Sequence, residues 1–186
     1  MSEAKRKIVV RAAGDSADVE QVRTLMREYA EDLARGPAGP AHLCITSYES
    51  ELAGLPGPYV APGALYLGLA GDEAAGCVAL KPVRGMVRRE KHGVLGGALE
   101  LKRLWVRPAY RGLGLGGRLV KAAIDHARMA GAGAIFLDTV PAAMPEANRL
   151  YGAMGFRKTE RYNENRVEGV EFFQLLLGEA VSSPPA

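Results

Sequence analysis

The sequence predicts an α/β (α+β) domain built on a mixed, mostly antiparallel β-sheet. Residues 64–70 (ALYLGLA) and 75–82 (AGCVALKP) have strand composition, and the short turn between them predicts an antiparallel hairpin. Farther along, the strand-like residues 98–106 and 134–140 flank a helical segment, which predicts a βαβ unit with two parallel strands. Together, the hairpin and the parallel pair require a mixed sheet.

The N-terminal part of the chain begins with a strand and an amphipathic helix. Residues 7–13 (KIVVRAA) are rich in β-branched side chains, and residues 14–16 supply a turn with two candidate helix caps. The helix ends before residue 36, and residues 37–62 indicate a long irregular connection with one helical turn near 48–52. The apolar stripe of the helix predicts the side that faces the core: Val19, Val22, Leu25, Met26, Tyr29 and Leu33.

The middle of the chain contains a basic segment. Residues 84–92 hold four Lys and Arg side chains around one glutamate, and we interpret them as a solvated hairpin loop rather than a phosphate-binding patch. The helix of the βαβ unit has an apolar side from Leu115 to Ala130 and stops at the glycines of residues 131–133.

The C-terminal part predicts a short helix and two further strands. Pro145 suits the first turn of a helix and Gly155 its end, so residues 145–154 are expected to be helical. Strands are expected at 157–162 and 170–177, with a loop between them. Residues 1–178 therefore form a single expected domain, followed by a flexible tail at residues 179–186.

Composition and charge exclude several classes of protein. The chain has 186 residues, and its 24 basic and 21 acidic side chains give a net charge of +3, which is too small for a general nucleic-acid binder. It has neither an apolar run long enough for a membrane span nor a secretory signal. Cys44 and Cys77 lack the spacing of a metal site or a disulfide framework, and Cys77 is expected in the core. We expect a metal-free cytoplasmic protein.

Two motifs overlap in the glycine-rich loop. Read as G-x-G-x-x-G, with Gly112, Gly114 and Gly117, the loop would bind a dinucleotide; against this, residues 107–111 separate it from the strand. Read as V-x-P-x-x-R-G-x-G-x-G from Val106 to Gly116, it is an anion cradle, in which successive backbone N–H groups at a helix start bind a diphosphate. A P-loop is excluded, because no Gly-Lys-Ser or Gly-Lys-Thr follows.

The second pattern resembles the acetyl-CoA-binding motif of the GNAT (Gcn5-related N-acetyltransferase) superfamily. The later segment Ala147-Asn148-Arg149-Leu150-Tyr151 with Gly155-Phe156 is similar to that family's A-x-x-L-Y-x-x-x-G-F. The order of predicted elements agrees over residues 8–177, and other short segments are similar to bacterial members of unassigned substrate. The resemblance implies a GNAT fold, with helices on both faces of the sheet and a central pair of parallel strands that splay apart.

The resemblance also implies where acetyl-CoA binds. The pantetheine arm would lie between the splayed strands, and the diphosphate would lie on the backbone of residues 111–117, with Arg111 or Arg118 adding positive charge. Asn148 would bond the pantetheine arm; alternatively its amide only satisfies nearby backbone groups. The implied cofactor-binding residues are Leu104, Trp105, Val106, Arg111, Gly112, Leu113, Gly114, Leu115, Gly116, Gly117, Asn148 and Tyr151.

The implied chemistry is direct attack of a primary amine on acetyl-CoA in a ternary complex. Tyr151 would be the general acid that protonates the thiolate, and the backbone N–H of Leu104 would stabilise the oxyanion. Glu100 matches the strand position of a catalytic glutamate in one branch of the family. Strand alternation puts it on the same face as Lys102, so Glu100 is either the general base or a partner in a structural ion pair.

The sequence does not identify the acceptor: a small amine, an amino acid and a peptide are all compatible with it. It also leaves open whether the donor carries an acetyl group or a longer acyl group. We expect the acceptor between residues 37–62, with Tyr48 and Tyr59, and the loop at 162–169; Arg103, Arg161 or Arg166 could bind an acceptor carboxylate. The alternative to an enzyme is a non-catalytic acyl-CoA-binding or regulatory module of the same fold. A homodimer is also left open.

Overall fold

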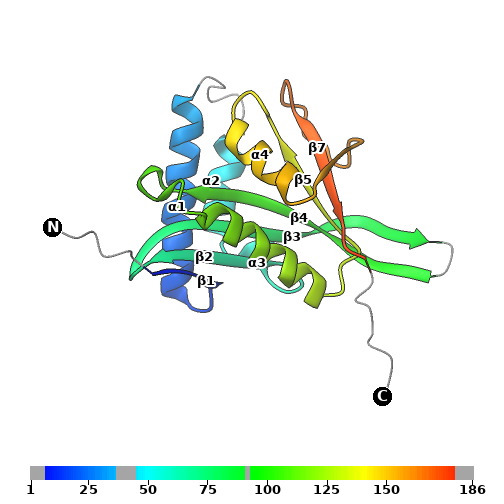
Figure 1. The fold of residues 1–186 in the computed structure, drawn as a ribbon, viewed down its shortest axis with the longest axis horizontal. Helices are drawn as coiled ribbons and strands as arrows, with labels where there is room; N and C mark the ends of the chain where they lie inside the picture. The colour runs from blue at the N-terminus through cyan, green and yellow to red at the C-terminus, as the bar shows by residue number, and fades with distance from the viewer. Residues whose placement is uncertain (1–6, 37–44, 91–92, 179–186) are drawn as a thin grey trace, which may run out of the picture.

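The computed structural model describes residues 7–36, 45–90 and 93–178, whose strands form one seven-stranded sheet in the order β1-β2-β3-β4-β5-β7-β6 (Figure 1). Short 3-10 turns, η2 and η3, lie at Gly57–Tyr59 and Pro108–Tyr110. The helices and strands are β1 (Ile8–Ala12), α1 (Ser16–Arg35), α2 (Ile45–Ala53), β2 (Ala64–Ala70), β3 (Glu73–Glu90), β4 (Gly93–Val106), α3 (Leu115–Met129), β5 (Ala134–Thr139), α4 (Pro145–Ala153), β6 (Arg157–Thr159) and β7 (Glu171–Leu176).

The expected splayed parallel pair is confirmed at β4 and β5. These strands pair in parallel only from Ala98 opposite Ala134 to Glu100 opposite Phe136, whereas all other neighbouring strands are antiparallel. Beyond Glu100 the two strands separate. A bulge in β4 accompanies the separation: its register against β3 shifts, and Arg103 has a φ of 58°.

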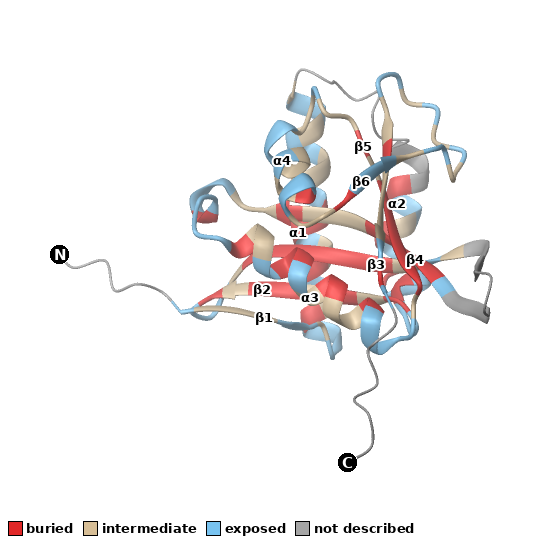
Figure 2. Ribbon diagram, turned by 45° about the vertical axis from the view of Figure 1, so that its right-hand side comes forward, coloured by how far each residue is buried: buried red, intermediate tan, exposed pale blue. Residues whose placement is uncertain are grey.

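Helices cover both faces of the sheet, as expected. One face packs against α3 and α4 through a core that includes Leu101, Leu119 and Tyr151. The other face packs against α1 and α2 through a second core that includes Leu25 and Trp105. Buried residues are concentrated in the central strands β2, β3 and β4 (Figure 2). The splayed end of β4 and β5 is thus held between two separate cores.

Three sequence expectations are corrected. Residues 84–90 are strand and not loop, because β3 extends to Glu90 and pairs with β4 in a long hairpin. The connection before β2 contains a full helix, α2, because Tyr48 and Leu52 pack into the core beside α1. β6 is shorter than expected and ends at Thr159.

Some expectations fall on residues that the structure does not describe. These are the first part of the connection, residues 37–44, the hairpin tip at 91–92, and the tail at 179–186. Within the described part of the chain, no helix combines the length and the apolar character needed to cross a lipid bilayer.

Candidate functional site

The glycine-rich loop forms the start of α3. Gly112 and Gly114 have φ values of 76° and 77°, in the left-handed region that side chains with a Cβ rarely adopt. Gly114 caps the helix, and no atom lies within 4 Å of a Cβ built at either glycine, so both positions need glycine for backbone conformation rather than for space. The first N–H groups of a helix have no intrahelical partner. The loop therefore presents backbone donors at the positive end of a 15-residue helix.

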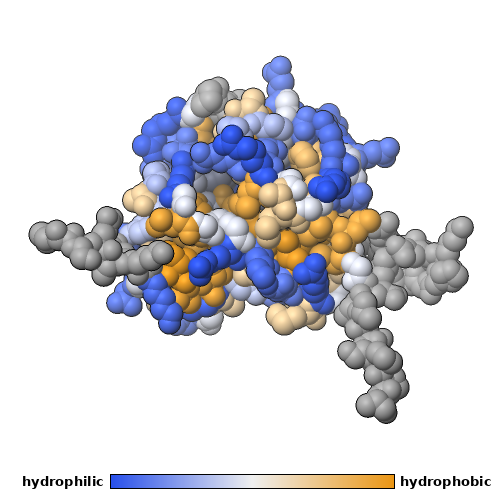
Figure 3. All heavy atoms as spheres, in the orientation of Figure 1, coloured by the Kyte–Doolittle hydropathy of each residue, from blue (hydrophilic) through white to orange (hydrophobic). Residues whose placement is uncertain are grey.

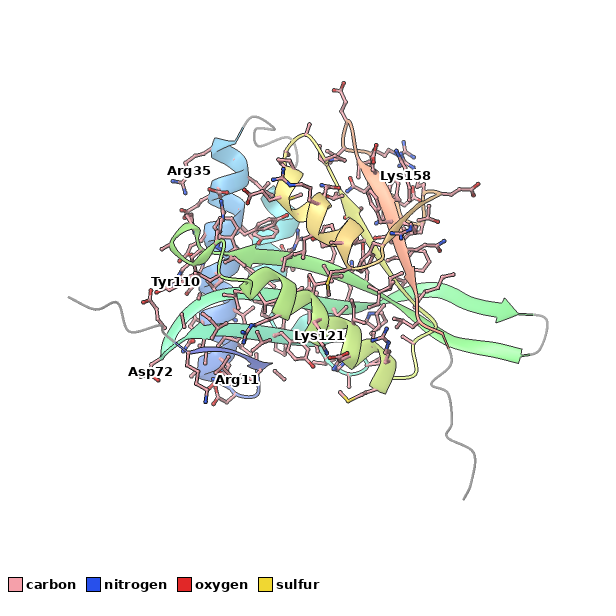
Figure 4. The ribbon with its side chains drawn as sticks, in the orientation of Figure 1. Arg11, Arg35, Asp72, Tyr110, Lys121 and Lys158 are labelled. Carbon is pink, nitrogen blue, oxygen red and sulfur yellow. The ribbon has the colours of Figure 1, made fainter. Side chains whose placement is uncertain are left out.

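A cleft of about 650 Å³ opens beside this loop. One side is formed by the end of β4 and the loop itself, and the other by the end of α1 and the start of α4. Arg35 lies at the end of α1 and Tyr110 in the loop before α3 (Figure 4). Of the residues expected to bind a cofactor, the cleft is lined by Leu104, Trp105, Val106, Arg111, Gly112, Gly114, Leu115 and Gly116.

The remaining expected residues lie elsewhere. Leu113 is 57% exposed and, like Gly117, does not line the cleft. Arg111 lines it, with its guanidinium 4.8 Å from the Trp105 ring centroid and 3.6 Å from the Asp32 carboxylate, which also lines the cleft. Arg118 instead donates a hydrogen bond to the carbonyl of Ile8 at 3.1 Å. Among the described residues, Arg111 is therefore the better placed of the two arginines for an anion in the cleft. On the face of the molecule drawn in Figure 3, apolar and hydrophilic residues are interspersed.

Asn148 lies in the first half of α4 with one half of its amide satisfied. Its Nδ2 donates to the carbonyl of Met144 at 2.8 Å and to Oγ1 of Thr139 at 3.1 Å. Its Oδ1 is buried and has no partner among the described residues. A buried acceptor without a donor is costly, which favours a partner for this oxygen, but Asn148 lines neither the cleft nor the cavity beside it. Both interpretations of Asn148 remain compatible with the structure: it satisfies a backbone group and also keeps an acceptor free.

A second cavity, of about 100 Å³, adjoins the cleft. The two share Tyr29, Leu33, Leu104, Ala143 and Met144 as walls. The second cavity adds Tyr151, together with the charged side chains of Lys102 and Asp138. Tyr151 is 7% exposed, and burial raises the pKa of its hydroxyl, which is therefore protonated throughout the neutral range. Leu104 thus lies where the two cavities meet, and Tyr151 lines the second cavity alone.

Glu100 belongs to a buried polar network beside this cavity. Its Oε1 accepts hydrogen bonds from Lys102 Nζ at 3.2 Å, the Tyr162 hydroxyl at 2.8 Å and Asn163 Nδ2 at 3.1 Å. Its Oε2 lies 3.1 Å from Lys81 Nζ. Burial alone would raise the pKa of Glu100, but the Lys102 and Lys81 ammonium groups hold it below its usual range. The ion pair with Lys102 that strand alternation predicted is present.

Asp138 is the second carboxylate of the network and was not predicted as a site residue. Its Oδ1 accepts from Lys102 Nζ at 3.2 Å, and its Oδ2 accepts from Asn163 Nδ2 at 2.8 Å and Asn165 Nδ2 at 3.1 Å. Burial would lower the pKa of Lys102, but Asp138 and Glu100 together raise it. The network therefore fastens the β6–β7 loop to β4 and β5. The one signal of this network in the sequence was the pair of charged residues, Glu100 and Lys102, on one face of an otherwise apolar strand.

Arg103, at the bulge of β4, is also fully engaged. Its Nε and Nη2 donate to the two carboxylate oxygens of Glu51 at 2.9 and 2.5 Å, and its guanidinium lies 4.5 Å from the Tyr48 ring centroid. Tyr59 donates a hydrogen bond to the same Glu51. Tyr48 and Tyr59 are both 3% exposed, so they pack in the core rather than line an open acceptor site. Sequence reasoning missed Glu51, which lies 52 residues before Arg103.

The cysteine and metal expectations can be compared with the described residues. Cys77 is fully buried, and burial raises the pKa of its thiol to about 12, which agrees with a core position. Cys44 lies outside the described residues. Within the described ranges, no group of three or more His, Cys, Asp or Glu side chains could hold a metal ion.

Comparisons with known proteins point to one family. The model of the Acetyltransferase (GNAT) family matches residues 47–156. An uncharacterized N-acetyltransferase of Schizosaccharomyces pombe is 34% identical over 161 residues, covering 85% of this chain and 88% of that protein. Among solved structures, an acetyltransferase from Streptococcus agalactiae is 18% identical with a TM-score of 0.67, covering 91% of this chain and 98% of its own. A putative acetyltransferase from Salmonella typhimurium, solved with acetyl-CoA, is 18% identical with a TM-score of 0.63, covering 96% and 98%.

Proposed function

The chain belongs to the GNAT family of N-acetyltransferases, and from this premise we propose that it transfers an acetyl group from acetyl-CoA directly to a primary amine. One observation carries the proposal: the cleft beside the glycine-rich loop adjoins, at Leu104, a second cavity that contains Tyr151. A donor in the first and an acceptor in the second would meet at that junction. The amine would therefore attack while both substrates are bound.

The cleft fits acetyl-CoA, which supplies the acetyl group as a thioester. The backbone N–H groups of residues 112–117 would bind its diphosphate, with Arg111 beside them. The unpartnered Oδ1 of Asn148 would accept a hydrogen bond from an amide N–H of the pantetheine arm. The unpaired edges of β4 and β5 beyond Glu100 would offer further backbone groups to the same arm.

Two groups would take part in the transfer itself, Leu104 at the junction and Tyr151 in the second cavity. The Leu104 N–H would donate a hydrogen bond to the carbonyl oxygen as negative charge develops there. The Tyr151 hydroxyl would transfer its proton to the departing thiolate, and the proton that the nitrogen loses on acylation would restore the hydroxyl. Because Cys77 is buried away from both cavities, the described residues give no support to an acyl-cysteine route.

The contacts of Glu100 support the structural ion pair rather than a base. A carboxylate bonded by two ammonium groups, with its pKa below the usual range, is a weak acceptor for the proton of an amine. We therefore expect kcat/KM of Glu100→Gln to rise with pH just as in the wild type, following the pKa of the acceptor amine. When two acceptors with different amine pKa values are compared, the pH at which kcat/KM rises should move by the same amount in the wild type and in Glu100→Gln. A rising limb that disappears only in Glu100→Gln would restore the role of base.

A thiol-release assay tests the proposed function. Acetyl-CoA is incubated with the protein and a panel of primary amines, and free thiol and acetylated amine are quantified together. We expect one thiol per acetylated amine, and no acetylated protein when the amine is omitted. Binding of acetyl-CoA without thiol release for any amine would contradict the proposed function, and acetyl-protein formed without amine would contradict direct transfer.

A further inference from the structure

We propose that the acceptor is a compact primary amine that carries no carboxylate, which excludes free amino acids. The inference rests on the proposed function, because it identifies the second cavity as the acceptor site. It follows from the size of that cavity, from its lining, and from the charges that surround it.

The second cavity is small and has a polar side and an apolar side. Its volume of about 100 Å³ accommodates the body of an amine with only a few carbon atoms. The apolar wall comes from four elements: Leu33 of α1, β4, the segment between β5 and α4, and the β6–β7 loop. The network of Glu100 and Asp138 fixes that loop against the sheet, so its wall is rigid. The aliphatic lining residues are Leu33, Leu101, Leu104, Val140, Ala143, Met144, Val167 and Val170.

The cations on the polar side of the cavity are already neutralised. Lys102 Nζ lies 3.2 Å from both Glu100 and Asp138, and Lys81 lies 3.1 Å from Glu100. These two lysines and two carboxylates balance to zero formal charge. Lys102 therefore has no unmatched positive charge to offer to a carboxylate of the acceptor.

Of the three arginines expected near the acceptor, Arg161 and Arg166 do not line the cavity. Arg103, which lines the cavity, is bound bidentately by Glu51. Arg161 donates to the backbone carbonyl of Asn165 at 2.6 Å, and Arg166 is 85% exposed. Residues 37–44, outside the described part, contain no lysine or arginine in the sequence. Among the described residues, the two cations that line the cavity, Lys102 and Arg103, are thus both paired with carboxylates.

An acceptor carboxylate would consequently be desolvated without a compensating cation, and it would lie near Asp138. Burying a charge without a partner is strongly unfavourable, whereas the attacking nitrogen is neutral and brings N–H donors that Asp138 can accept. A carboxyl amide has nearly the same size as a carboxylate but no charge. Comparing the two separates charge from size.

The test compares isoamylamine, leucinamide and leucine as acceptors. Each kcat/KM for CoA release is divided by the neutral fraction of the amine at the assay pH. We expect leucine to fall at least about tenfold below leucinamide, the effect of an unpaired buried charge, while leucinamide stays within about fivefold of isoamylamine. Equal values for leucine and leucinamide would overturn the inference.

A variant that leaves Arg103 without its carboxylate partner provides the matched comparison. Glu51→Gln removes the carboxylate that neutralises Arg103, so we expect the disadvantage of leucine to shrink at least about fivefold. Glu49→Gln removes an exposed carboxylate from the same helix and should leave the ratio unchanged. Thermal unfolding shows that both variants are folded. A folded Glu51→Gln with the wild-type ratio would contradict the role assigned to the Arg103–Glu51 pair.

Calorimetry separates failure of this inference from failure of the proposed function. The three compounds are titrated into the protein saturated with CoA, where no transfer takes place. If the three compounds bind in the expected order but the assay shows no CoA release, the proposed function is overturned and the inference about the acceptor is not. Acetylation of all three acceptors at equal rates, or no binding by isoamylamine, would overturn the inference alone.

Discussion

Gly114→Val is expected to weaken acetyl-CoA binding by at least about a hundredfold. The residue has a φ of 77° and caps α3, so valine would be forced into a left-handed conformation that costs about 1–2 kcal/mol, or would move the loop. Moving the loop turns away the N–H donors of the first helical turn, on which the diphosphate depends. Titration calorimetry with acetyl-CoA measures the loss.

Gly71→Val is the matched control for this variant. Gly71 has a φ of 65° in the turn between β2 and β3, and a Cβ there also meets nothing within 4 Å. Both variants therefore have a similar conformational penalty, visible as a similar fall in Tm. Only Gly114→Val should lose acetyl-CoA binding. Unchanged affinity in that variant would refute the role of the loop.

Tyr151→Phe is expected to lower kcat by about ten- to a thousandfold, the range of a lost general acid. Phenylalanine keeps the ring that packs 5.7 Å from Phe156, so Tm should change little. The affinity for acetyl-CoA should also be preserved, because Tyr151 lines the second cavity and not the cleft. Steady-state kinetics and calorimetry together separate these effects.

Tyr66→Phe controls for the loss of a tyrosine hydroxyl elsewhere. Tyr66 is partly buried, contacts His126 and lies in neither of the two cavities. Its kcat should equal that of the wild type. If Tyr151→Phe also turned over at the wild-type rate, another group would have to protonate the thiolate.

The features that the sequence predicted are those encoded locally. The loop from Arg107 to Gly117 specifies its own conformation through proline and glycine, and α3 follows directly from its apolar spacing. The parallel strands on either side of it needed only the βαβ pattern. The length of the β3–β4 hairpin was missed because its basic residues resemble a loop, although strand pairing depends on the partner strand as much as on composition.

The features that were missed depend on contacts between distant segments. Glu51 and Arg103 meet only because α2 packs beneath the bulge of β4. Asp138 and Glu100 share Asn163 only because β4 and β5 are neighbours and the β6–β7 loop folds over both. No periodicity or spacing in one segment contains that information. The charge balance that bears on the acceptor was therefore visible only in three dimensions.

Because the parallel pairing between β4 and β5 is short, we expect the thermal stability of the protein to depend on the concentration of acetyl-CoA. Only three residue pairs, from Ala98–Ala134 to Glu100–Phe136, make up the backbone pairing between β4 and β5, and a ligand arm between the strands would replace the missing pairing. A ligand at about 100 times its Kd adds about 2.7 kcal/mol to the free energy of unfolding. A cell short of the thioester would thus hold a measurably more fragile enzyme.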